Sequence, residues 1–236
     1  MFMAENGQRA ERAYEKVLDY IRSEVRRGRL KRGERLPPER ELAEQLGVSR
    51  NSVREAMRTL SLMGFVSSVQ GAGNYVSCDL EGNLSSSLEM MLLLGETNYL
   101  QVSQLRRALE SETARLAATY MLPGQLEKLA SLAKRMEEET DPQKGAMLDQ
   151  QFHMLLCESS GNLLLRSLYR AMVSTVNRFI GTMYVRIVEN PEQAAQLHHS
   201  HDVIVRALAE RDEEAAIPGI RQHFQVVETS IVEHGK

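Results

Sequence analysis

Apolar residues near the start of the chain recur three or four positions apart, which is the spacing of a helix with one buried face. Two short helices follow, the first with Leu42 and Leu46 on its inner face and Gly47 at its end. Ser49 is a suitable N-cap for the second, since its hydroxyl can accept an unpaired backbone N–H. Two short β-prone runs then flank a glycine-rich turn at residues 71–73. This order of elements predicts a winged helix-turn-helix.

Beyond a cluster of Asp, Gly, Asn and Ser residues at 78–86, the apolar spacing is helical throughout. Pro, Gly and Asn residues separate the helical segments. Pro218 lies near the start of the last segment, where it allows a kink or a later start. The predicted helices are residues 84–95, 99–120, 124–138, 144–159, 162–188, 191–209 and 212–233.

We therefore predict a mostly α protein with two domains. Residues 1–78 form the winged helix-turn-helix, and residues 79–236 form an antiparallel helical bundle of about seven helices. Charge divides at nearly the same place, because residues 1–77 carry a net charge of +4 and the remainder carries −7. A basic front joined to an acidic back suggests one module that meets an anion and another with a different task.

Several classes of protein are excluded by composition. The whole chain has a net charge of −3, which argues against a protein that coats nucleic acid indiscriminately. No apolar run is long enough for a membrane span, and the polar start lacks the hydrophobic region of a signal peptide. The chain has only two cysteines and no CxxC motif, which argues against a disulfide framework and against a thiolate zinc site. We expect a cytoplasmic protein without a membrane partner.

The candidate DNA contacts gather at the start of the second short helix. Arg50 and Arg54 are one turn apart on one face, where a recognition helix meets base edges in the major groove. An arginine can bond bidentately to guanine, and small hydroxyl or amide side chains suit phosphate oxygens. Arg40 opens the preceding helix, and a glycine at the wing tip allows close approach to a minor groove. The predicted DNA-binding residues are Arg40, Ser49, Arg50, Asn51, Ser52, Arg54 and Gly71.

The six histidines all lie in the acidic back of the chain. Asp149 and His153 are four positions apart and so share one helical face. His201 and His223 lie on the last two predicted helices. A carboxylate with imidazoles suits zinc, nickel, manganese or iron, but spacing alone leaves open whether these helices converge or whether the histidines are merely structural.

The front of the chain resembles the GntR superfamily of bacterial transcriptional regulators. The resemblance covers about residues 12–77 and rests on the run GERLPPERELAEQLGVSRNSVREAMRTL, which begins at Gly33, and on the wing residues 71–76. It implies base contacts from Arg40, Arg50 and Arg54, with phosphate contacts from the small polar residues between them and a wing contact near Gly71.

The helical part is similar to the FCD effector-binding domain of the fatty-acid-regulator-type GntR subgroup. This similarity covers about residues 84–233 and rests on the motifs LRRALE, DQQFH, SHDVI and RQH. Many FCD domains bind a divalent metal through one Asp and three His. The resemblance therefore implies a metal, zinc before nickel, manganese or iron, with the ligands Asp149, His153, His201 and His223.

Four protein ligands leave positions open on a six-coordinate metal, which suits a small carboxylate effector. Arg106 is the candidate for a second carboxylate clamp, since guanidinium matches carboxylate geometry. An ion pair with Glu110, four positions further along the helix, is an equal alternative.

We interpret the chain as a ligand-responsive transcriptional regulator and not an enzyme. A homodimer would bind a palindromic double-stranded operator, because operator symmetry mirrors protein symmetry. A sugar acid, hydroxy acid or dicarboxylate would control it; the alternative is a regulator for which the metal itself is the signal. A metal-dependent hydrolase is disfavoured, because the sequence has no HExxH motif or equivalent.

Overall fold

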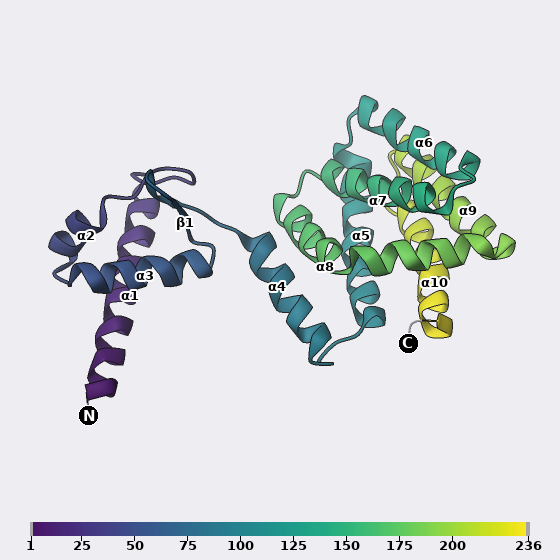
Figure 1. The fold of residues 1–236 in the computed structure, drawn as a ribbon. Helices are drawn as coiled ribbons and strands as arrows, with labels where there is room; N and C mark the ends of the chain where they lie inside the picture. Colours follow the sequence, from purple (N-terminus) through teal and green to yellow (C-terminus); the bar gives the residue numbers. More distant parts are fainter. Residues whose placement is uncertain (1, 235–236) are drawn as a thin grey trace. The chain divides into compact units, whose positions relative to one another are not determined.

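The computed structural model describes residues 2–234, whose contacts divide the chain into two units, one through Asn83 and one from Leu84 (Figure 1). No helix in this described part has the length and apolar content to cross a membrane. The mostly α fold with a small hairpin confirms the predicted fold class.

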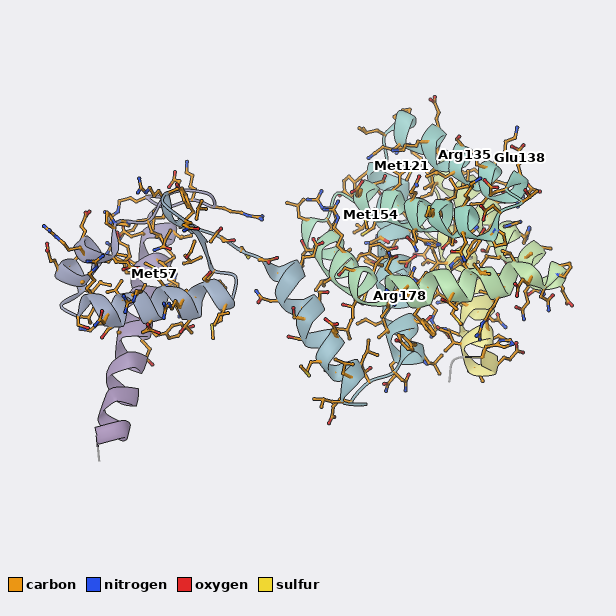
Figure 2. The ribbon with its side chains drawn as sticks, viewed as in Figure 1. Met57, Met121, Arg135, Glu138, Met154 and Arg178 are labelled. Atoms are coloured by element: carbon orange, nitrogen blue, oxygen red, sulfur yellow. The ribbon has the colours of Figure 1, made fainter. Side chains whose placement is uncertain are left out.

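The first unit contains three helices and a two-stranded antiparallel hairpin. One face of each helix contributes to a single core, in which Val17, Val53 and Leu60 are fully buried. Figure 2 shows Met57 among the side chains that fill this core. The elements are α1 Phe2–Arg26, α2 Glu39–Leu46, α3 Arg50–Leu62, β1 Val66–Val69 and β2 Gly73–Val76.

A tight turn joins α2 to α3 and fixes where α3 begins. Gly47 adopts a φ of 62° in the left-handed region, and its N–H donates to the Ala43 carbonyl. Two residues later the Ser49 hydroxyl accepts the backbone N–H of Ser52 at 3.1 Å, as an N-cap does. Glycine supplies the left-handed conformation without the steric cost of a Cβ atom. These two residues therefore direct the start of α3 as the sequence predicts.

The wing hairpin is anchored to the segment before α2, a contact that the apolar pattern does not reveal. The Val76 N–H donates to the Glu34 carbonyl at 2.9 Å, and the Leu36 N–H donates to the Asn74 carbonyl at 2.8 Å. Arg35 and Tyr75 form an isolated antiparallel bridge between these bonds. The wing is therefore held to the segment before α2 by these two hydrogen bonds and an isolated bridge.

The second unit is the predicted helical bundle. Its largest core lies between the helices and is built around Phe152, Leu156, Ile220 and Phe224, all fully buried. The helix α4, which contains the division between the two units, precedes it. The helices are α4 Leu80–Leu93, α5 Tyr99–Tyr120, α6 Pro123–Glu138, α7 Pro142–Ser159, α8 Leu163–Glu189, α9 Pro191–Ala209 and α10 Ala216–His234.

Two helix starts differ from the predicted ranges by four residues, each because a carboxylate captures backbone N–H groups, and the other starts differ by at most two residues. The predicted helix at 84–95 begins four residues earlier, where the Asp79 carboxylate accepts the Gly82 N–H at 2.9 Å. The predicted helix at 212–233 begins four residues later, because Asp212 accepts the N–H groups of Glu214 and Ala215 in a preceding turn. Pro218 consequently lies in the first turn of α10, where its missing N–H has no helical partner to lose.

The close crossing of α9 and α10 depends on one glycine (Figure 1). A Cβ atom at Gly219 would lie 2.7 Å from Ile204 Cγ1 and 3.1 Å from the Ser200 carbonyl oxygen. The crossing lies within one or two turns of His201 on α9 and His223 on α10. Gly219 therefore helps to bring these two histidines together.

We predict that Gly219→Ala lowers the free energy of unfolding by about 1–3 kcal/mol, the usual cost of overpacking a close-packed contact. Gly124→Ala is the matched control, because a Cβ atom there meets nothing within 4 Å. Denaturant unfolding of both variants measures the difference. Equal midpoints for the two variants would contradict a close α9–α10 contact.

Candidate metal centre and nucleic-acid interface

Four side chains from three helices converge inside the second unit. Asp149 and His153 come from α7, His201 from α9 and His223 from α10. One ligand atom from each lies within 4.8 Å of the others, and all four side chains are buried. The structure thus brings together the four residues whose convergence spacing alone leaves open.

Most side-chain polar atoms of this Asp–His cluster are buried without a hydrogen-bond partner. His201 Nε2 lies 3.2 Å and His153 Nε2 lies 3.6 Å from Asp149 Oδ1, and neither contact has hydrogen-bond geometry. Both ring nitrogens of His201 and Nδ1 of His223 are likewise buried without a hydrogen-bond partner. Buried polar atoms left unpaired are costly, so nitrogens and an oxygen that face one another fit a cation held between them.

The ionisation of the cluster also suits metal binding. Burial raises the pKa of the Asp149 carboxyl, but His153 and His201 outweigh it and hold this pKa well below its usual range. Burial lowers the pKa of His201 and, with the help of His153, lowers that of His223 well below the usual value. At neutral pH Asp149 is therefore a carboxylate, and His201 and His223 are neutral imidazoles, the forms that bind a metal.

Glu110 on α5 is a member of the site that the sequence motifs do not identify. Its Oε2 lies 2.5 Å from His153 Nδ1, on the side of the ring away from Asp149. Burial lowers the pKa of His153, but Glu110 and Asp149 outweigh it and raise this pKa to about 9. A carboxylate on the second ring nitrogen fixes the tautomer and orientation of a ligating histidine. The signal in the sequence is a glutamate one turn after Arg106 on the inner face of α5, which is also lined by Val102, Ala114 and Ala117.

Arg106 forms the ion pair that the sequence leaves as one of two alternatives. Its Nε and Nη2 donate to Glu110 Oε1 at 3.1 and 2.8 Å, with both side chains buried. The guanidinium also lies over the rings of Phe224 and Tyr169, at 5.2 and 5.8 Å from their centroids. Whether Arg106 also contacts an effector stays a prediction.

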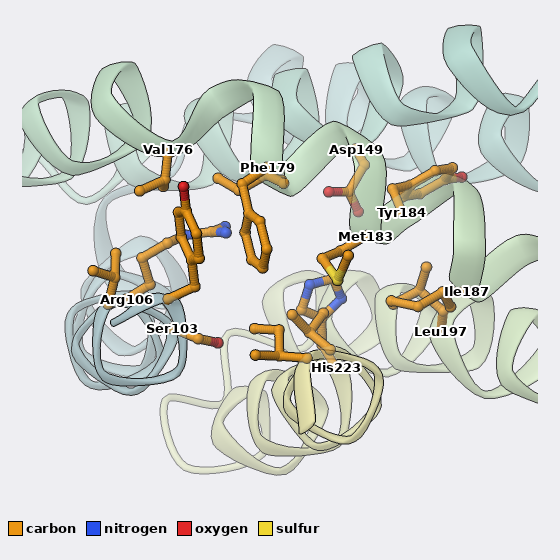
Figure 3. A pocket seen from close by; sticks show the side chains of 15 residues that line it. Ser103, Arg106, Asp149, Val176, Phe179, Met183, Tyr184, Ile187, Leu197 and His223 are labelled. Atoms are coloured by element: carbon orange, nitrogen blue, oxygen red, sulfur yellow. The ribbon is translucent and has the colours of Figure 1, made fainter. Parts of the chain in front are cut away.

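A small cavity lies beside the cluster (Figure 3). Its volume is about 30 Å³, and Asp149, His223, Arg106 and Ser103 contribute its polar wall. Figure 3 shows Phe179 among these side chains, and the Phe179 ring stacks on Tyr99 with centroids 3.7 Å apart. The cavity therefore joins the cluster to the first residue of α5.

The side chains predicted to contact DNA lie around the starts of α2 and α3. Arg40, Arg50 and Arg54 have side chains that are 83%, 72% and 50% exposed. Their carboxylate partners lie 3.4–3.9 Å away and are themselves partly or largely exposed. Exposed pairs of this kind contribute little, so the guanidinium groups can exchange them for DNA at small cost.

The small polar residues of this surface cap the start of α3, whose N-terminal end faces the same surface. Ser49 Oγ caps α3 and lies 2.8 Å from Ser52 Oγ, so both hydroxyls already have a protein partner. The first turn of α3 has no acidic side chain, which leaves the positive end of the helix dipole available to an anion. Gly71 has a φ of 76° in the wing turn and open space where a Cβ atom would lie.

We predict that Glu110→Gln lowers the free energy of unfolding by about 3 kcal/mol, because Arg106 would lose its charged partner while staying buried. Glu112→Gln on the same helix is the control, since it removes only the more exposed pair with Arg115 and costs at most about 1 kcal/mol. Chemical unfolding of both variants without added metal measures this. A Glu110→Gln variant as stable as Glu112→Gln would refute the buried pair.

Comparison with known proteins agrees with this geometry in both units. Residues 13–76 match the family described as bacterial regulatory proteins, gntR family, and residues 101–226 match the FCD domain. The Uxu operon transcriptional regulator of Escherichia coli K12 is 30% identical over 95% of this chain and 88% of its own. The transcriptional regulator LutR of Bacillus subtilis 168 is 30% identical over 86% of this chain and 94% of its own.

A solved structure has the same fold. The GntR protein of Streptococcus agalactiae superposes with a TM-score of 0.59 and 26% identity, over 94% of this chain and 99% of its own. The relatives named above are regulators of transcription, and FCD domains commonly bind metal. The chain belongs to the GntR family of bacterial transcriptional regulators and carries a C-terminal FCD effector-binding domain.

Proposed function

We propose that this regulator binds a palindromic DNA operator as a cytoplasmic homodimer and that a small carboxylate beside a divalent metal controls this binding. The observation that carries the proposal is the buried Asp–His cluster, with its unpaired ligand atoms next to a cavity. A two-fold protein dimer matches a palindrome because both have the same symmetry. Family membership supports the DNA and effector roles in general.

In the proposed complex the exposed arginines of the first unit read the operator. Arg50 and Arg54 point from one face of α3 and would contact base edges, with Arg40 beside them. The N-terminal backbone of α3 and the residues Ser49, Asn51 and Ser52 would contact phosphates. Gly71 allows the wing backbone to approach the adjacent groove.

Asp149, His153, His201 and His223 would hold the metal, with zinc as the first candidate for this mixed oxygen and nitrogen donor set. Once bound, the metal supplies a Lewis-acidic centre for a carboxylate oxygen. Glu110 orients His153 through Nδ1, and Arg106 holds Glu110 in place. These two side chains thus preorganise the ligand set.

The route from effector to DNA would begin at the small cavity. A volume of about 30 Å³ accommodates about two water molecules, so an organic acid must displace wall side chains. Phe179 stacks on Tyr99, which begins α5 directly after the loop from α4. An effector can shift the equilibrium only if it binds one arrangement better than the other. Movement of this ring pair would provide such a difference.

We predict that Arg50→Ala and Arg54→Ala each reduce discrimination between operator and random DNA by roughly tenfold or more, the loss of about 1–3 kcal/mol expected for a base contact. The DNA is a sequence that the wild-type protein selects from random oligonucleotides, and fluorescence anisotropy measures both affinities. Arg135→Ala is the control, because this exposed arginine of α6 lies outside the DNA-binding unit (Figure 2). Unchanged discrimination in the α3 variants would sink the assignment.

We predict that Asp149→Asn and His201→Ala weaken zinc binding by more than about tenfold, since even the loss of a supporting partner of a ligand costs that much. His199→Ala is the control, because His199 lies on the same helix with its side chain exposed. Elemental analysis and chelator competition measure the metal per chain and its affinity. Equal metal content in all three variants and the wild type would rule out the proposed ligands.

A further inference from the structure

The charges buried around the cavity are few and can be counted. Among the side chains that the structure describes, the buried Asp, Glu, Lys and Arg residues are Arg106, Glu110 and Asp149. With every histidine of the cluster in the neutral form that binds a metal, these three side chains carry a single negative charge. A divalent cation held by neutral imidazoles changes the buried sum to a single positive charge, which one anionic group neutralises. A second anionic group would leave a buried negative charge without compensation, which is costly.

Arg106 offers no spare charge for a second carboxylate. Its Nε and Nη2 both donate to Glu110 Oε1, and the rings of Phe224 and Tyr169 lie beside the guanidinium. The nearby Arg107 on the same helix is paired with Glu228 at 3.2 Å. A ligand carboxylate that took Arg106 would leave the buried Glu110 without its charged partner, which is costly. Arg106 therefore remains paired with Glu110.

The rest of the cavity wall is mainly apolar and includes the rings of Tyr99 and Tyr184. Ser103 is an exception, because its Oγ is buried on the wall and has no hydrogen-bond partner. A single hydroxyl or keto oxygen on a ligand can satisfy it, whereas the further hydroxyls of a sugar acid would face hydrocarbon. The apolar wall includes Val176, Phe179, Met183, Ile187, Leu197 and Ile231.

We infer that the effector is a short-chain monocarboxylate that bears one further oxygen next to its carboxylate and an otherwise apolar chain. This narrows the proposed function, on which it rests, and excludes dicarboxylates and sugar acids. The charge count excludes dicarboxylates, and the apolar wall excludes sugar acids. The small volume of the cavity favours an acid with a short chain. Ser103 is the residue that reads the additional oxygen.

The test is a matched series of acids titrated calorimetrically into the zinc-loaded full chain. Malate is 2-hydroxybutyrate with its terminal methyl replaced by a carboxylate, galacturonate is a sugar acid, and butyrate lacks the hydroxyl. We expect 2-hydroxybutyrate to bind at least about tenfold tighter than each of the other three, consistent with the cost of a buried unpaired group. Malate or galacturonate binding as tightly would overturn the inference while leaving carboxylate control of the regulator intact. Binding of none of the acids would overturn both.

Ser103→Ala tests the role of the hydroxyl separately. We expect it to weaken 2-hydroxybutyrate about fivefold or more and to leave butyrate unchanged. Ser111→Ala on the same helix is the control, because the Ser111 hydroxyl donates to the Arg107 carbonyl and lies outside this cavity. Equal weakening of both acids by Ser103→Ala would contradict reading of the additional oxygen.

Met183→Lys tests the charge count by placing a cation in the wall, and it should shift the preference from 2-hydroxybutyrate towards malate by about tenfold or more. Met147→Lys is the control for the same substitution at an exposed position. A folded Met183→Lys protein that still prefers 2-hydroxybutyrate to the same degree would contradict the charge count. If Met183→Lys does not fold, the wild-type acid series and Ser103→Ala still decide the question.

Discussion

The sensor domain is organised around carboxylates that are buried and must be compensated. Glu110 and Asp149 both lie inside the helical bundle, where an isolated charge would be strongly unfavourable. Glu110 obtains its compensation from Arg106 and from His153. Asp149 has no arginine partner of this kind, and its nearest ionisable neighbours are His153 and His201. A cation among these imidazoles completes the compensation, which links the stability of the bundle to its occupancy.

The helices must be placed accurately for this compensation to work. The Asp–His cluster draws on α7, α9 and α10, and Glu110 adds α5. The bare backbone of Gly219 lets α9 and α10 approach closely. The DNA-reading unit follows the opposite principle, since its arginines are exposed and loosely paired. Charges that are buried and paired suit a sensor with a fixed geometry. Exposed charges in weak ion pairs suit a surface that exchanges those partners for DNA.

Local signals in the sequence predicted most of the fold. Gly47 and Ser49 fix the helix-turn-helix because their roles depend only on neighbouring backbone groups. Asp79 and Asp212 shifted two helix starts, since the competition of a side chain for backbone N–H groups is hard to read from apolar spacing. The apolar pattern does not indicate the pairing of Leu36 with Asn74, because this pairing joins segments that are distant in the sequence.

The candidate metal centre was only partly predictable from the residues. Asp149 and His153 share a helical face, which spacing shows, but the approach of His201 and His223 depends on helix packing. The family resemblance supplied that missing link. The sequence indicates Glu110 only as a partner for Arg106, because nothing in its own helix shows that His153 lies against its second oxygen.

The most direct test measures DNA affinity while metal and carboxylate are varied independently. Anisotropy titrations with the selected operator would be made at saturating zinc with 2-hydroxybutyrate varied, and then at constant 2-hydroxybutyrate with zinc varied. The account predicts that the acid changes operator affinity at constant zinc and has no effect on protein stripped of metal. An affinity that responds to zinc alone and is indifferent to every carboxylate would contradict it and make the metal itself the signal.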